Sequence, residues 1–109
     1  QRFGHKFLKE SKVALDSDGT TCLIALIKDG KLTIGNIGDS SALLIRNNQA
    51  FELTSEQTPT RIDEYKRITS KSGLIVPVGD TMRIGGVLAV SRSIGDLFYK
   101  EYVISEPET

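Results

Sequence analysis

The sequence is poor in several residue types, and each shortage removes a class of function. It holds one cysteine, Cys22, and one histidine, His5, in 109 residues. A single thiol can neither close an internal disulfide nor supply a thiolate metal cage, and its apolar surroundings predict a small buried side chain. His5 has no acidic or cysteine companion at ligand spacing, so we interpret it as a solvated helix residue. No Ser-His-Asp or Cys-His catalytic set can be assembled from these residues.

Net charge and long apolar runs are also lacking. The 14 basic residues balance the 14 acidic ones, so neither a nucleic acid nor an anionic membrane surface is a predicted partner. No apolar stretch approaches the roughly 20 residues of a membrane span, and the first residues lack the character of a signal peptide. We therefore expect an intracellular protein, cytoplasmic or nuclear, with no membrane partner. The chain begins without methionine, and we expect both of its ends to lie inside a longer protein.

The first half of the sequence reads as strands. Residues 21–28 and 31–37 are mainly apolar and are separated by Asp29-Gly30, a dipeptide that tolerates the positive φ angles of a type I′ hairpin turn. A third strand is expected at 41–46, and Asn47-Asn48 leads into a fourth at 50–54. These patterns predict a four-strand meander.

A helix is expected at residues 60–72, where Ile62, Tyr65 and Ile68 recur at helical spacing. Thr60 is the expected N-cap, Asp63 and Glu64 suit the positive end of the helix dipole, and Gly73 suits the position after the last turn. Residues 1–15 have a partial helical pattern. The remaining expectations are short strands at 74–77, 81–84 and 87–90, followed by an irregular stretch at 91–100.

Consecutive hairpins with a segregated helix predict an α+β fold. The runs 22–27 and 42–45 are almost continuously apolar, which is typical of strands covered on both faces, so a second sheet or layer is needed. The chain supplies too few strands to build that layer itself. Residues 1–109 are therefore expected to be part of one larger domain.

Asp39 is the one candidate metal ligand. It lies in Gly38-Asp39-Ser40, at the end of an expected buried strand, where a carboxylate can project into a cleft and bind Mg²⁺ or Mn²⁺. The alternative is that Asp39 ends the strand and caps a turn. Local sequence alone leaves both interpretations open.

Other polar motifs have simpler structural explanations. Asp18-Gly19 and Gly85-Gly86 are expected to be turns, and no phosphate-loop pattern follows the second pair. Arg92 is expected to be a buried guanidinium paired with Asp96 or Glu106. No role is assigned to Asp80.

In their order along the chain, these motifs resemble the type 2C family of metal-dependent protein serine/threonine phosphatases. Asp18-Gly19-Thr20-Thr21 resembles that family's Ser-Gly-Thr-Thr, and residues 36–42 resemble its Asn-Val-Gly-Asp-Ser-Arg-Ala. Residues 88–96 resemble its Leu-Ala-Val-Ser-Arg-Ala-Phe-Gly-Asp. The pattern from Leu53 to Gly73 resembles the approach to the family's helix, and Glu106-Pro107-Glu108 completes the match.

The resemblance implies a β-sandwich of antiparallel sheets flanked by helices, with a dinuclear Mg²⁺ or Mn²⁺ centre. In that family a metal-activated water dephosphorylates phosphoserine and phosphothreonine proteins. Asp39 aligns with a family aspartate at an accessory metal position. The family's Asp-Gly-His-Gly motif and other principal ligands would lie before Gln1 or after Thr109, so no catalytic residue is expected here. Residues 1–109 would be the central portion of a monomeric domain, truncated at both ends and inactive alone.

Two departures from the family pattern stand out. Ser41 replaces the usual arginine after Gly-Asp-Ser, and Glu56-Gln57-Thr58-Pro59 replaces Asp-His-Lys-Pro. An alternative hypothesis is a catalytically inactive relative that serves as a binding or regulatory module. A third is a free-standing interaction domain, which predicts cooperative unfolding of the isolated chain.

Overall fold

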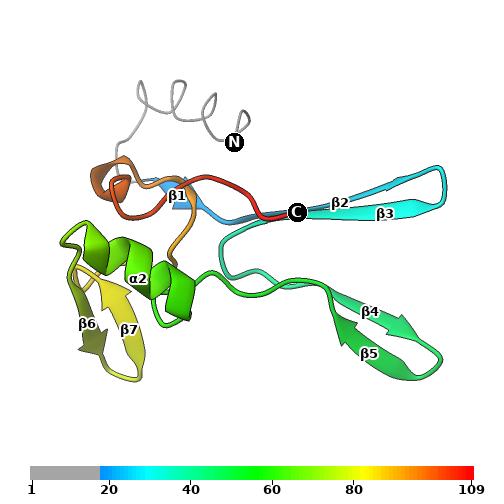
Figure 1. The fold of residues 1–109 in the computed structure, drawn as a ribbon, viewed down its shortest axis with the longest axis horizontal. Coiled ribbons are helices and arrows are strands. Elements are labelled where there is room, and N and C mark those ends of the chain that lie inside the picture. The colour runs from blue at the N-terminus through cyan, green and yellow to red at the C-terminus, as the bar shows by residue number, and fades with distance from the viewer. Residues whose placement is uncertain (1–17) are drawn as a thin grey trace.

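The computed structural model describes residues 18–109, which Figure 1 draws in colour. This part of the chain is built mainly of short antiparallel strand pairs, with one α-helix, so the predicted α+β class is confirmed. The helix expected within residues 1–15, and His5, lie outside the described residues. In chain order the elements are β1 (Gly19–Thr20), β2 (Cys22–Lys28), β3 (Lys31–Ile37), β4 (Leu43–Arg46), β5 (Gln49–Glu52), α2 (Ile62–Ser70), β6 (Ile75–Val78), β7 (Thr81–Ile84), β8 (Ile94–Gly95) and the 3₁₀ helix η1 (Leu97–Tyr99).

The predicted β2–β3 hairpin is confirmed. Its register runs from Cys22 opposite Ile37 to Lys28 opposite Lys31. Asp29 and Gly30 have φ angles of 52° and 72°, the two positive values that a type I′ turn requires. The local residues thus determine this turn.

The β4–β5 hairpin also has two positive φ angles in its turn, 52° at Asn47 and 61° at Asn48. The predicted four-strand meander is wrong, however, because each hairpin is a separate two-stranded sheet. Figure 1 shows the two hairpins projecting from the same end of the molecule as separate arms. Between them, Gly38 adopts a φ of 112° and turns the chain away from β3 before β4 can pair with it.

Helix α2 differs from its prediction at both ends. The N-cap is Arg61 rather than Thr60, whose hydroxyl group instead contacts that of Thr58. At the other end the Ser72 N–H donates to Thr69 and the Gly73 N–H donates to Ile68, the pattern of a Schellman motif.

Ser72, not Gly73, occupies the left-handed position of this motif, with a φ of 65°. Gly73 is needed for another reason, because a Cβ atom there would collide with Ile68 and Tyr102. The glycine therefore allows close packing at the end of α2.

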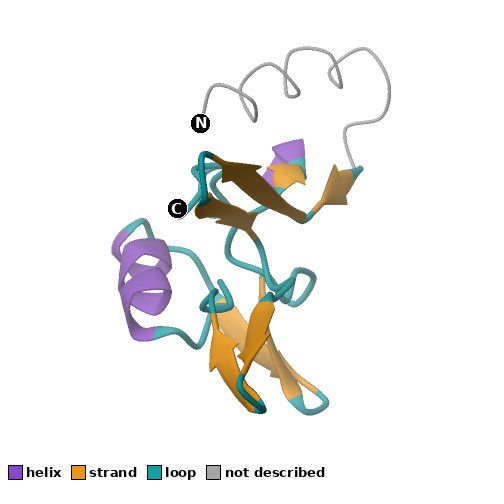
Figure 2. Ribbon diagram, turned by 90° about the vertical axis from the view of Figure 1, so that its right-hand side faces the viewer, coloured by secondary structure: helices purple, strands orange, loops and turns teal. Residues whose placement is uncertain are grey.

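The core lies under α2. Ile68, Ile84 and Val103 are fully buried, and Ile75, Leu88, Tyr99 and Tyr102 pack around them. The expected apolar face of the helix is only partly correct, because Ile62 and Tyr65 are 72% and 48% exposed. The helix instead buries Glu64 together with Ile68, one turn apart. Figure 2 shows α2 on one flank of the molecule.

The chain after α2 is more irregular than expected. Two of the predicted short strands form, as β6 and β7, and they pair with each other. Residues 87–90 form no strand and contribute a single bridge between Leu88 and Ile84. The reason is a tight turn at Gly85 and Gly86, both with positive φ, which brings only one residue back onto β7. Strand β8 and η1 are short elements within the stretch expected to be irregular.

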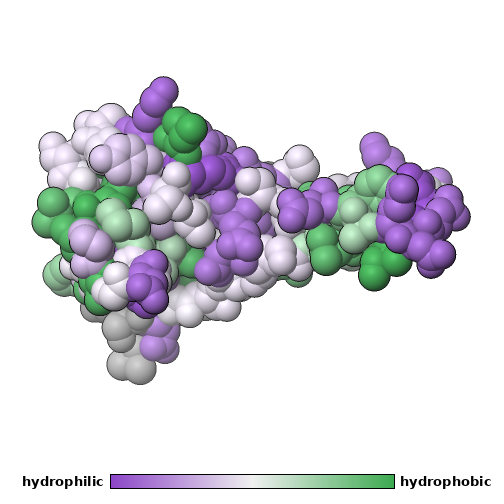
Figure 3. All heavy atoms as spheres, turned by 90° about the horizontal axis from the view of Figure 1, so that it is seen from below, coloured by the Kyte–Doolittle hydropathy of each residue, from purple (hydrophilic) through white to green (hydrophobic). Residues whose placement is uncertain are grey.

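The two projecting hairpins leave apolar side chains exposed. On β2, Ile24, Leu26 and Ile27 are 53%, 56% and 77% exposed, and on β4 Ile45 is 74% exposed. Figure 3 shows hydrophobic residues on the surface of this projecting end. Cys22 is half-buried, not buried as predicted, and lines a shallow apolar depression beside Ile24 and Leu26. Within residues 18–109, no helix is long and apolar enough to cross a membrane.

Candidate functional site

Asp39 lies in the turn directly after β3. Gly38, which precedes it, has a φ of 112°, and a Cβ atom at this position would collide with the side chain of Thr21. Only glycine fits there without strain. The hydroxyl oxygens of Thr21 and Ser40 lie 2.9 Å apart and hold the other side of the turn. The side chain of Asp39 is exposed, so its carboxylate is open to a ligand.

Asp39 cannot hold a metal ion with its described neighbours alone. Residues 18–109 contain no group of three or more His, Cys, Asp or Glu side chains arranged for a cation. Mg²⁺ requires a nearly octahedral set of oxygen ligands, to which one carboxylate contributes one or two atoms. A metal role for Asp39 therefore stays a prediction, and it requires ligands from elsewhere.

The turn at Gly38 is held by Gln57, a residue that is fully buried. Its side-chain Oε1 accepts a hydrogen bond of 2.5 Å from the Gly38 N–H. Its backbone N–H donates to the Gly38 carbonyl over 3.0 Å. Its Nε2 donates to the Asn36 carbonyl and to Glu108 Oε1, over 3.1 and 2.9 Å. Gln57 thus connects the end of β3 to the C-terminal segment.

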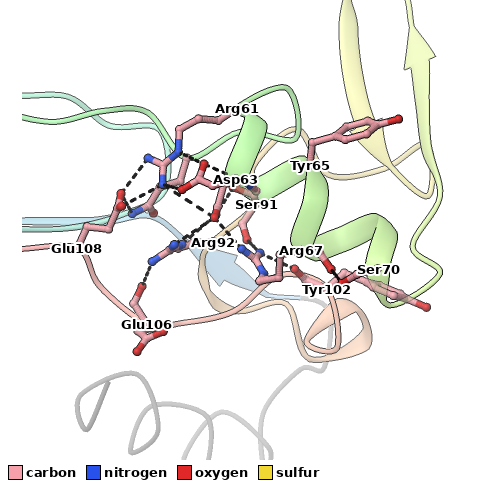
Figure 4. Close-up of polar contacts among 12 residues, drawn as sticks. Arg61, Asp63, Tyr65, Arg67, Ser70, Ser91, Arg92, Tyr102, Glu106 and Glu108 are labelled. Atoms are coloured by element: carbon pink, nitrogen blue, oxygen red, sulfur yellow. Dashed lines mark hydrogen bonds and ion pairs between the residues drawn. The ribbon is translucent and has the colours of Figure 1, made fainter.

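A second buried polar group is Glu64 on α2, whose side chain is only 2% exposed. Its carboxylate accepts hydrogen bonds from Ser91 Oγ at 2.8 Å, from Arg92 Nε at 2.9 Å and from an Arg67 nitrogen at 2.8 Å. Burial alone would raise the pKa of Glu64, but these hydrogen bonds outweigh burial and hold the pKa below its ordinary value. Figure 4 shows Arg67, Arg92 and Ser91 in this group of polar contacts beside α2.

Arg61 lies between the two buried side chains, Gln57 and Glu64. Its guanidinium donates to Asp63 and, over two bonds of 2.9 Å, to both oxygens of Glu108. The hydrogen bond from Arg61 lowers the pKa of Asp63 to about 2. The same guanidinium holds the pKa of Glu108 below its ordinary value despite partial burial. Such bidentate pairs fix geometry as well as charge.

The predicted partners of Arg92 need correction. Its carboxylate partner is Glu64, whereas Glu106 contributes only its backbone carbonyl, 2.9 Å from the guanidinium. Asp96 instead accepts a hydrogen bond of 2.6 Å from Ser93 Oγ. Sequence proximity suggested the nearby carboxylates, but packing of α2 over the segment after Val90 brings Glu64 closer.

The remaining candidates behave as structural residues. Strand β1 pairs with β8, so Asp18-Gly19 lies beside Gly95-Asp96 and the Asp96 N–H donates to the Asp18 carbonyl over 2.8 Å. Gly85 and Gly86 form the expected turn. Asp80 lies in the turn between β6 and β7 and is exposed. The structure therefore brings Asp18-Gly19 and Gly95-Asp96 together through the β1–β8 pairing and a backbone hydrogen bond.

Sequence analysis missed the polar network around the buried side chains of Gln57 and Glu64, to which Arg61, Arg67 and Glu108 contribute. One signal was present, because Glu64 lies four residues before Ile68 and therefore on the same face of the helix. A carboxylate on a buried helix face requires cationic partners. The identity of those partners depended on tertiary packing.

Comparisons with known proteins place the chain in a family. The family described as Protein phosphatase 2C matches residues 2–109. The protein named "Probable protein phosphatase 2C 2" from Arabidopsis thaliana is 46% identical over 103 residues, which are 94% of this chain and 26% of that protein. The rice protein named "Probable protein phosphatase 2C member 13, mitochondrial" is 38% identical over 99% of this chain and 30% of its own length.

Solved structures share the fold. A sex-determining protein of C. elegans superposes with a TM-score of 0.91 at 23% identity, over 98% of this chain and 27% of that one. The serine-threonine phosphatase 2C of Toxoplasma gondii gives a TM-score of 0.85 at 21% identity, over 98% of this chain and 41% of that one. The expected phosphatase-like fold is therefore confirmed. The chain spans about a quarter of the curated relatives it matches, and it belongs to the protein phosphatase 2C family.

Proposed function

We propose that these residues are the central part of a larger phosphatase 2C domain that hydrolyses phosphoserine and phosphothreonine in proteins. The observation that carries the proposal is the family match over residues 2–109, together with an Asp39 turn built for exposure of its carboxylate. Phosphorylated proteins are the substrate class, and the domain is expected to be intracellular and monomeric.

Two features of the structure support a larger domain. The hairpins expose large apolar side chains, including Ile27 at 77% and Ile45 at 74%, at positions where apolar surface usually packs against another layer. The buried Oδ1 atom of Asn36, beside the Asp39 turn, has no hydrogen-bond partner among the described residues. Buried oxygens are normally satisfied, so a donor from elsewhere in the protein is expected.

The residues at the turn fit a hard cation. Mg²⁺ and Mn²⁺ prefer carboxylate oxygens, and Asp39 presents one at a strand end whose backbone is held by Gln57. When bound, such ions activate water at neutral pH and neutralise charge on phosphoryl oxygens. Asp39 would supply one ligand at an accessory position, and the other ligands would come from the rest of the domain.

The direct test is phosphate release from a phosphothreonine peptide with and without Mn²⁺. The complete protein that carries this chain should release phosphate only with the metal, and a chelator should abolish turnover. The 109-residue chain alone should be inactive, since residues 18–109 contain no group of side chains arranged for a cation. Asp39→Ala in the complete protein should reduce the rate at limiting Mn²⁺ more than at saturating Mn²⁺.

A folded complete protein with no turnover at any Mn²⁺ concentration would contradict the proposal. It would support the alternative of an inactive family member that binds partners. Cooperative unfolding of the complete protein, measured by urea denaturation, separates that outcome from simple misfolding.

A further inference from the structure

Every polar group of Gln57 is used. The side-chain oxygen accepts from Gly38, the side-chain nitrogen donates to Asn36 and Glu108, the backbone N–H donates to Gly38, and the backbone carbonyl accepts from Ser91. The two ends of the side-chain amide differ in chemistry, so this set of partners permits one orientation only. Gln57 is therefore a rigid support and not a space-filling residue.

Gln57 holds Gly38, the residue directly before Asp39. Gln57 binds both the N–H and the carbonyl of Gly38. These bonds hold Gly38 in its left-handed conformation, and the direction of the next peptide follows from that conformation. The side chain of Asp39, which makes no hydrogen bond within residues 18–109, receives its orientation through its backbone.

The side chain of Gln57 is itself held in place by Glu108. Glu108 accepts from Gln57 Nε2 and is clamped by the two nitrogens of Arg61 at the start of α2. A continuous path of hydrogen bonds therefore runs from α2 through Glu108 and Gln57 to the Asp39 turn. The family pattern that this sequence resembles has histidine at this place, but the amide of Gln57 offers a donor and an acceptor at every pH.

Resting on the proposed cation role of Asp39, we propose that Gln57 is a positioning residue for that cation site. It holds the Gly38 peptide so that the Asp39 carboxylate points in the direction required for cation binding. Outer partners that orient metal ligands typically contribute about 10-fold or more to metal affinity.

The test is a Mn²⁺ titration of the complete protein, followed by paramagnetic broadening of the Asp39 and Ser40 amide resonances. Gln57→Met fills a similar volume but has no polar groups. We expect this variant to need about 10-fold more Mn²⁺ for the same broadening. Without metal, its Gly38 amide should exchange with solvent faster than in the wild type, because that N–H loses its acceptor.

A matched control is Ser91→Ala, which removes another buried hydrogen bond, to Glu64, but leaves the Asp39 turn untouched. It should lower stability without shifting the titration. Gln57→His places at this position the residue of the family pattern, whose neutral ring keeps one acceptor and one donor. This variant should recover part of the affinity lost in Gln57→Met, and it keeps the test decisive where Gln57→Met folds poorly.

The outcomes separate the two proposals. Unchanged titration in Gln57→Met, with a weakened one in Asp39→Ala, overturns the positioning role and leaves the cation role of Asp39 standing. Unchanged titration in Asp39→Ala overturns both. An equal shift in Gln57→Met and Ser91→Ala also overturns positioning, because a general loss of stability would then explain the result.

Discussion

The two ends of this molecule differ in how completely they are packed. At one end α2 covers a small core, and the side chain of Glu64, 2% exposed, is surrounded by arginines. At the other end the β2–β3 and β4–β5 hairpins carry large apolar side chains that are in contact with solvent. The first region buries its central carboxylate, Glu64, beside an apolar core that contains Ile68. The second region forms its two hairpins, but residues 18–109 provide no layer that covers their apolar side chains.

Hairpin formation and burial of the strand faces are therefore separate events in this molecule. A type I′ turn needs only a few residues with positive φ, whereas burial of both strand faces requires partners from elsewhere. The following predictions test the contrast in the complete protein, where the proposed covering layer is present.

The largest effect is expected at the packed end. Glu64→Ala should reduce the free energy of unfolding by about 3–5 kcal/mol, because it leaves the guanidinium groups of Arg67 and Arg92 half-buried without their carboxylate. Urea denaturation measures this change. Asp63→Asn, at an exposed pair, should cost about 1 kcal/mol or less. Equal losses in the two variants would contradict a buried network.

A somewhat smaller loss is expected from the apolar core. Ile68→Ala removes a fully buried side chain and should reduce the free energy of unfolding by about 2–4 kcal/mol. Ile62→Ala on the same helix, at a side chain that is 72% exposed, should change it by about 0.5 kcal/mol or less. A large effect at Ile62 would mean that α2 is also covered by another part of the protein.

A substitution on β2 tests directly whether another layer covers the hairpins in the complete protein. Ile27 is 77% exposed, much like Ile62, yet Ile27→Ser should cost about 2 kcal/mol in the complete protein because a further layer covers β2. Ile62→Ser serves as the matched control. If the two serine variants lose equally little stability, the hairpin is solvent-exposed in the whole protein and the proposed layer is wrong.

The smallest effect concerns acid stability. The pKa of Asp63 is about 2 in the folded chain and 3.8 ordinarily. Because the folded value is the lower one, the stabilisation is complete above about pH 4 and disappears as the pH falls towards 2. Asp63→Asn should therefore lose stability less steeply than the wild type over this interval, as followed by circular dichroism. Parallel acid profiles would contradict the ion pair with Arg61.

Several local elements follow directly from the residues that form them. Asp29-Gly30 specified its hairpin because those residues accept positive φ, and the ordered motifs pointed to the correct family before any geometry was known. The cap of α2 was misplaced because Thr60 and Arg61 both precede the helix, and the side chain of Thr60 bonds to Thr58 instead.

The polar connections depend on tertiary packing. Arg92 pairs with Glu64 across 28 residues of sequence, and Gln57 reaches Glu108 across 51. Spacing along the chain carries no information about such pairs, because they form only when α2 packs over the loops that follow it. The residues that support the Asp39 turn were therefore present in the sequence, but their role depended on a fold that brings distant segments into hydrogen-bonding distance.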